Sequence, residues 1–132
     1  MPAVLGLATL GCSRQRAERP ATYAARGVVL VADKPAAGAK VQLNPVEGKR
    51  LAAAYPHAIV QSDGSFRLTT YKTGDGAPAG TYALTVTWPG PPERGREEGP
   101  DRLQGRYADR FHPVSEVHIV AGENDLGAIR LK

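Results

Sequence analysis

Apolar and polar residues alternate strictly from residue 81 to residue 88, which reads T-Y-A-L-T-V-T-W. Successive side chains of a strand point to opposite faces of its sheet, so this pattern predicts a strand with one buried and one solvated face. The buried face would carry the large side chains Tyr82, Leu84, Val86 and Trp88. The solvated face would carry the small side chains Thr81, Ala83, Thr85 and Thr87.

Six further segments have strand patterns, and turn residues separate them. The run G-V-V-L-V-A inside residues 23–32 is short, continuous and rich in β-branched residues, which is typical of a buried strand. The other five are residues 39–44, 58–62, 65–70, 114–120 and 126–131. Their expected inward side chains include Phe66, Leu68, Ile119 and Ile129. Three large side chains between strands are expected to return the chain to the core: Leu103, Tyr107 and Phe111.

Two short motifs are expected to fix turns beside these strands. Asp63-Gly64 is a tight-turn dipeptide, because glycine adopts a positive φ without steric cost. In P-A-G-T-Y, Gly80 leads into a strand that begins near Tyr82. This is the arrangement of a tyrosine corner, in which the hydroxyl hydrogen-bonds to an upstream backbone group. We therefore expect structural roles for these four residues.

Seven strands at hairpin-like spacing, without a helix long enough to cover a sheet, predict two antiparallel sheets packed face to face. The 15 glycines and 11 prolines among 132 residues fit many short strands joined by turns. The expected fold is an all-β, seven-stranded antiparallel Greek-key β-sandwich over residues 23–132.

Residues 89–100 read P-G-P-P-E-R-G-R-E-E-G-P and contain no apolar side chain except proline. They are expected to form an exposed loop, and loops of this length are uncommon unless they are functional or disordered. A second, glycine-rich connection covers residues 72–80. A strand rather than a helix follows it, and the G-x-x-x-x-G-K-[ST] pattern is absent, so phosphate binding is not expected there.

The N-terminal residues resemble an export signal. Residues 1–11 carry no charge, and Cys12, the only cysteine, follows them directly. The segment L-A-T-L-G-C-S resembles the lipobox of bacterial lipoproteins, in which a cysteine is acylated and becomes the N-terminus, although Thr9 stands where leucine is usual and a basic leader is missing. Residues 1–12 would then be the signal segment and residues 13–22 a flexible tether. The alternative is an unmodified Cys12 behind a disordered start.

Charge and hydropathy exclude two classes of partner contact. Seventeen Lys and Arg residues against thirteen Asp and Glu residues give a net charge of +4. The basic residues are scattered among acidic ones and form no stripe with aromatic residues, so nucleic-acid binding is not expected. No apolar run reaches the roughly 18 residues that span a bilayer. Contact with a membrane is therefore expected through a lipid on Cys12.

Candidate catalytic and metal-binding groups are few. His57, His112 and His118 have no partner at ligand spacing, so neither a metal nor another cofactor is expected. An internal crosslink between Lys40 and Asn124, of the kind formed in collagen-adhesin domains, is not expected, because Lys40 would face outward and Asn124 would lie in a turn. No nucleophile elbow or pair of carboxylates marks a catalytic site.

Segments along most of the chain resemble, in one order, the carboxypeptidase regulatory-like, transthyretin-like β-sandwich domains of planctomycete-type lipoproteins. They read G-V-V-L-V-A-D-K-P-A-A-G-A-K-V-Q-L, S-D-G-S-F-R-L-T-T-Y, G-A-P-A-G-T-Y-A-L-T-V-T-W-P, L-Q-G-R-Y-A-D and A-G-E-N-D-L-G-A-I-R-L. The resemblance covers about residues 23–132. It implies a seven-stranded prealbumin-like or immunoglobulin-like sandwich that is exported, often membrane-tethered, and without assigned catalysis. Transthyretin-related hydrolases share the general fold but end in Y-R-G-S, whereas this chain ends in A-I-R-L-K.

Two functions remain open at this point. The first is a non-catalytic module of the cell envelope that binds a protein or glycan partner through its loops, chiefly residues 89–100 and 72–78. The second is a structural spacer without a specific ligand. Trp88 has two corresponding interpretations, as a cap on the end of the core or as an exposed aromatic platform for a sugar or a peptide.

Overall fold

The computed structural model describes residues 19–46 and 54–132. The expectations for the export signal, for Cys12 and for most of the tether concern residues outside these ranges. Within them the chain forms ten strands and no helix. The strands are β1 (Thr22–Tyr23), β2 (Ala25–Val31), β3 (Lys34–Pro35), β4 (Lys40–Pro45), β5 (His57–Ile59), β6 (Ser65–Arg67), β7 (Ala77–Pro78), β8 (Gly80–Thr87), β9 (Ser115–Ile119) and β10 (Asn124–Leu131).

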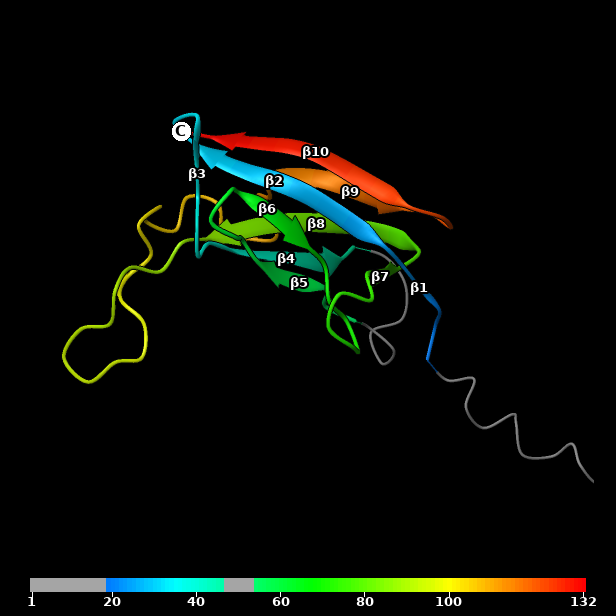
Figure 1. The fold of residues 1–132 in the computed structure, drawn as a ribbon, viewed down its shortest axis with the longest axis horizontal. Helices are drawn as coiled ribbons and strands as arrows, with labels where there is room; N and C mark the ends of the chain where they lie inside the picture. Colours follow the sequence, from blue (N-terminus) through cyan, green and yellow to red (C-terminus); the bar gives the residue numbers. More distant parts are fainter. Residues whose placement is uncertain (1–18, 47–53) are drawn as a thin grey trace, which may run out of the picture.

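Two four-stranded sheets make up the body of the protein. One has the order β5-β4-β8-β9, and in the other β2 pairs with β10 along one edge and with β6 and β3 along the opposite edge. β1 and β7 form a separate two-stranded pair. The two larger sheets stack on each other in Figure 1, an all-β arrangement consistent with a β-sandwich.

The side chains between the sheets are those that the period-two pattern places inward. Phe66, Leu68, Leu84, Val86, Ile119 and Ile129 are all buried, with exposed fractions of at most 8%. They belong to a single hydrophobic cluster that also contains Val29, Val41, Leu43 and Leu103. Burial of apolar surface in such a cluster is the main force that holds two sheets together. The predicted inward faces are therefore confirmed.

The prediction of purely antiparallel sheets is wrong, because β10 pairs with β2 in parallel. Asn124 lies opposite Ala25 and Leu131 lies opposite Val31, with an irregularity between Asp125 and Ala128. A parallel pair needs a long connection between its strands. Here the chain between β2 and β10 passes through the other sheet, so β10 returns to β2 in the same direction.

Two expectations about exposure are also corrected. Ala83 and Thr85, expected on a solvated face, are only 3% and 7% exposed. The reason is that β8 lies inside its sheet, between β4 and β9. Phe111, expected to return the chain to the core, is 75% exposed. It lies in a loop that leaves the edge of β8 after Tyr107 and rejoins it at Val114, where Val86 N donates to Tyr107 O and Val114 N donates to Leu84 O.

The expected turn residues lie at turns. Gly64 has a φ of +91° and donates its N–H to Gln61 O, while Asp63 Oδ1 accepts hydrogen bonds from the N–H and the hydroxyl of Ser65. The Tyr82 hydroxyl donates to Pro78 O at 2.8 Å, which ties the start of β8 to the backbone before it. Burial raises the pKa of this phenol, so Tyr82 remains a hydrogen-bond donor at neutral pH.

The folded domain begins slightly before residue 23. Thr22 already belongs to β1, and the Arg19 guanidinium lies 4.3 Å from the centre of the Tyr71 ring. β1 also packs closely on Gly76, where a Cβ would lie 1.9 Å from Tyr23 O. The last residues of the expected tether, 19–22, are therefore held against the domain.

Candidate functional site

The loop formed by residues 89–101 projects from one end of the protein. In Figure 1 it lies at the left, whereas β1 and the start of the described chain lie at the opposite end. Its base is closed by backbone hydrogen bonds from Gly90 N to Pro100 O and from Gly99 N to Gly90 O. Residues 91–98 are all exposed. The loop thus presents a solvated tip on a fixed base.

Asp101 organises this base. Its Oδ1 accepts hydrogen bonds from the N–H groups of Trp88 and Leu103, and its Oδ2 accepts one from Gly105 N. Partial burial raises the pKa of Asp101, but these three bonds and the charge of Arg106 lower it more, so that the pKa lies below its ordinary value. The carboxylate therefore connects the end of β8 to the segment that follows the loop.

Trp88 lies at the same base. Its ring is half-buried and packs against the core, and its Nε1 donates to Ala37 O at 2.8 Å. The Arg102 guanidinium lies 4.7 Å from the ring centre, a cation–π distance. Since the core and Arg102 both contact the ring, the geometry favours the capping role of Trp88 over an open aromatic platform.

The second predicted loop does not join the first. Residues 72–78 lie close to β1, because β7 pairs with β1, and Figure 1 places them away from the loop 89–101. Asp75 folds this segment by accepting hydrogen bonds from the N–H groups of Thr70, Tyr71 and Lys72. Burial raises the pKa of Asp75, and the backbone bonds outweigh this effect and lower it. The two loops cannot form one contact surface.

The three histidines also lie apart. His57 Nδ1 is 3.2 Å from Tyr55 O, His112 Nδ1 is 3.0 Å from Asp109 Oδ2, and His118 Nδ1 is 3.1 Å from Thr81 Oγ1. Among residues 19–46 and 54–132, no group of three or more metal-ligating side chains comes together. The same ranges contain no helix suited to crossing a membrane.

Lys40 and Asn124 have different partners. Lys40 Nζ forms an ion pair with Glu98 Oε2 of the loop 89–101. Asn124, expected in a turn, is a buried residue at the start of β10. Its amide donates to Ala24 O, Val120 O and Gly122 O and accepts from Val120 N. The two side chains hypothesised as a crosslink are therefore held in separate networks.

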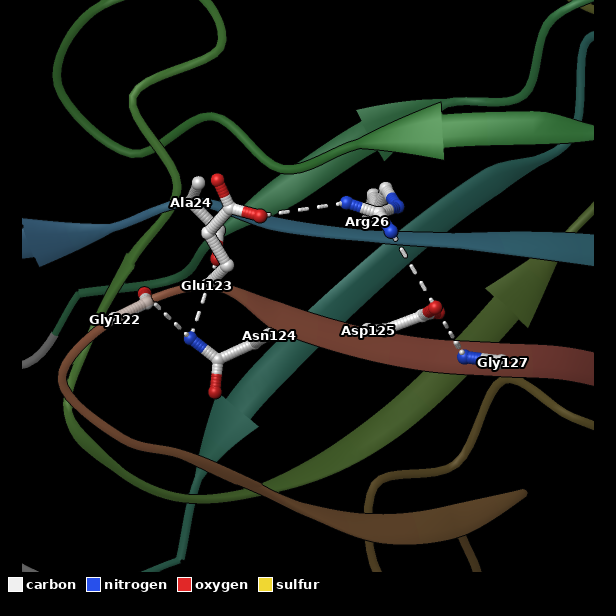
Figure 2. A network of polar contacts seen from close by, with 7 residues as sticks. All are labelled: Ala24, Arg26, Gly122, Glu123, Asn124, Asp125 and Gly127. Carbon is white, nitrogen blue, oxygen red and sulfur yellow. Dashed lines mark hydrogen bonds and ion pairs between the residues drawn. The ribbon is translucent and has the colours of Figure 1, made fainter.

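Figure 2 shows the contacts around Asn124. Its amide nitrogen points to Ala24 and Gly122, and on the neighbouring strand Arg26 lies between Glu123 and Asp125. The ion pairs of Arg26 are long, 3.8 Å to Glu123 and 3.5 Å to Asp125, and exposed. Exposed pairs of this kind contribute little to stability, so the buried amide dominates the network.

A cleft lies on the outer face of the β5-β4-β8-β9 sheet, the face turned away from the core. We call it the outer cleft, and its volume is about 430 Å³. Its lining includes Lys40, Gln42, Asn44, His57, Thr85 and Arg110. Cross-strand pairing sets these residues side by side, because Gln42 lies opposite both His57 and Thr85. The alternation within each strand predicts which side chains face outward, but it does not predict that those of three strands lie side by side.

Replacing Asp101 with asparagine is expected to reduce the loss in the free energy of unfolding between neutral and acidic pH. The pKa of Asp101 is depressed in the folded state, so its stabilising contribution is present above the ordinary value of 3.8 and is lost as pH falls through the folded-state pKa. The free energy of unfolding of both proteins, measured from about pH 2 to pH 7, should differ most at neutral pH and converge in acid. A difference that does not vary with pH would contradict this role.

No protein-family model matches the chain, and no curated protein matches it.

Proposed function

We propose that this chain is a non-catalytic binding or scaffolding module of the cell envelope, tethered through an acylated Cys12. In this proposal it presents the loop 89–101 to a protein or glycan partner. The observation that carries it is the position of this loop. The exposed tip stands on a base fixed by Asp101, at the end opposite to β1, where the tether would enter. A partner could therefore reach the loop without meeting the membrane.

The proposal includes the prealbumin-like or immunoglobulin-like sandwich that the sequence resemblance implies. Seven strands of three or more residues, in two stacked sheets around one core, support it. The separate hydrogen-bond partners of the three histidines support a role without catalysis.

Shortening the loop tests the partner contact. In the test variant a brief Gly-Ser connection replaces residues 91–98, while Gly90, Gly99 and Asp101 keep the base intact. Wild-type and variant chains are used to capture partners from an envelope extract. A partner lost only from the variant is the expected result, because the exposed tip is the proposed contact. A control variant changes Lys72 and Thr73 to serine in the exposed loop at the other end. Capture of no partner by any of the three chains would favour a structural spacer, and equal capture by all three would contradict a contact at the loop tip.

The tether is tested separately. Mass spectrometry of the native N-terminus should show acyl chains on Cys12, and Cys12→Ser should release the protein from the membrane fraction. An unmodified Cys12 would contradict the anchor but leave the loop contact untouched.

A further inference from the structure

The floor of the outer cleft is made of side chains that both donate and accept hydrogen bonds. Gln42 Nε2 donates to Asn44 Oδ1 at 2.8 Å, and Asn44 Nδ2 donates to Ala83 O and Thr85 Oγ1. Asn44 and Thr85 are only 5% and 7% exposed, so this network is fixed. Gln42 Oε1 and Thr87 Oγ1 accept no hydrogen bond from the described residues, and Thr87 also lines the cleft.

The wall of the cleft beside β8 is formed by the loop between Tyr107 and Val114. Asp109 fixes the loop here, because its Oδ1 accepts from Phe111 N and its Oδ2 contacts His112 Nδ1. The hydrogen bonds from His112 and Phe111 hold the pKa of Asp109 below its ordinary value. Arg110, which lines the cleft, extends from this turn. Its guanidinium lies 5.0 Å from the centre of the exposed Phe111 ring.

The charges of the cleft do not cancel. Lys40 lines the floor, but its Nζ is paired with Glu98. Arg110 forms no ion pair with a carboxylate within the described residues. Arg110 therefore lines the cleft without an ion pair to any described residue, although its charge acts on the neighbouring Asp109 carboxylate. A guanidinium matches the planar, two-oxygen geometry of a carboxylate.

We infer that the outer cleft binds a saccharide that carries a carboxylate, such as a uronic acid. The hydroxyls of a sugar donate and accept hydrogen bonds, as do the side chains of Gln42 and Thr87. Its carboxylate would meet Arg110. A guanidinium also binds phosphate, but the backbone N–H groups of β4 and β8, which could add further donors for its extra oxygens, are engaged in their ladder. A cleft of about 430 Å³ is within the size range of small-molecule sites.

This inference goes beyond the proposed function, because the cleft lies on the face of a sheet and not at the loop tip. The two can fail separately. If the loop 89–101 captures no partner, saccharide binding in the cleft is unaffected. If saccharides do not bind, a partner at the loop tip remains.

Binding to the full chain tests the inference directly. The probes are oligosaccharides of galacturonate, glucuronate and mannuronate, each used beside its carboxyl-reduced, neutral form. Titration calorimetry should show binding of at least one acidic form. Its affinity should be about tenfold above that of the neutral form, which corresponds to the free energy of one charged hydrogen-bond pair. Added salt should reduce this difference, because ions screen exposed charges. Equal affinity for both forms, or no binding across the panel, would overturn the inference.

Three variants locate the site. Arg110→Gln should remove the preference for the acidic form, an about tenfold loss, and leave affinity for the neutral form unchanged. Arg94→Gln makes the same charge change on the exposed loop tip and should have no effect. Glu98→Gln releases Lys40 and should strengthen acidic binding about threefold or more, a gain that damage to the fold would not produce. An Arg110→Gln chain that keeps wild-type preference would also overturn the inference.

Discussion

Replacing Phe66 with alanine is expected to lower the free energy of unfolding by about 4 kcal/mol, a large part of the stability of a domain of this size. The ring is 1% exposed and lies between the sheets. Gly27 on β2 is directly opposite, and a Cβ there would lie 2.7 Å from Phe66 Cζ. The ring thus fills the space over a residue without a side chain, and no neighbour can replace it.

Phe111→Ala is the matched control for this change. It removes the same side chain from a position that is 75% exposed, and the effect should stay within about 0.5 kcal/mol. Urea denaturation followed by Trp88 fluorescence measures both variants. If the two lose similar stability, the assignment of Phe66 to the core and of Phe111 to the surface is wrong.

Replacing Asn124 with alanine is expected to cost about 3 kcal/mol. The change leaves Val120 N and the carbonyl groups of Ala24 and Val120 without their side-chain partner at the point where the chain crosses between sheets. Leaving a buried donor or acceptor without its partner costs more free energy than an average hydrogen bond contributes to stability. Hydrogen exchange should show faster exchange of the Val120 amide.

Asp125→Ala is the matched control for this change, because it removes exposed contacts next to Asn124 and leaves the buried amide in place. Asp125 contacts Arg26 and accepts a hydrogen bond from Gly127 N, and both contacts are at the surface. Its removal should cost about 1 kcal/mol or less. An effect as large as that of Asn124→Ala would mean that the ion pairs, rather than the buried amide, hold the turn.

The strands were predictable because their burial depends on local alternation. Burial follows the period of two from Ser65 to Leu68. In β8 the large side chains Tyr82, Leu84 and Val86 are buried as the alternation predicts, but Ala83 and Thr85 are buried as well. The partner of each strand was not predictable in the same way. Parallel pairing of β10 with β2 depends on the path of the whole chain between them, which no local pattern contains.

The polar residues that shape the loops were missed for a related reason. Asp75, Asp101 and Asn124 act on backbone groups that the fold brings to them. In the sequence Asp75 and Asp101 stand beside glycine or proline in loop segments, where an aspartate is ordinary. The outer cleft likewise needs three strands in register before Gln42, His57 and Thr85 become neighbours.

The pairing of β2 with β10 has a consequence for biosynthesis. Arg26 and Asp125 are in contact although they are 99 residues apart in the sequence. One edge of β2 therefore has no partner strand until almost all of the domain has been synthesised. Contacts between such distant residues form slowly. A nascent chain therefore cannot complete this sheet before its last strand, β10, has been synthesised.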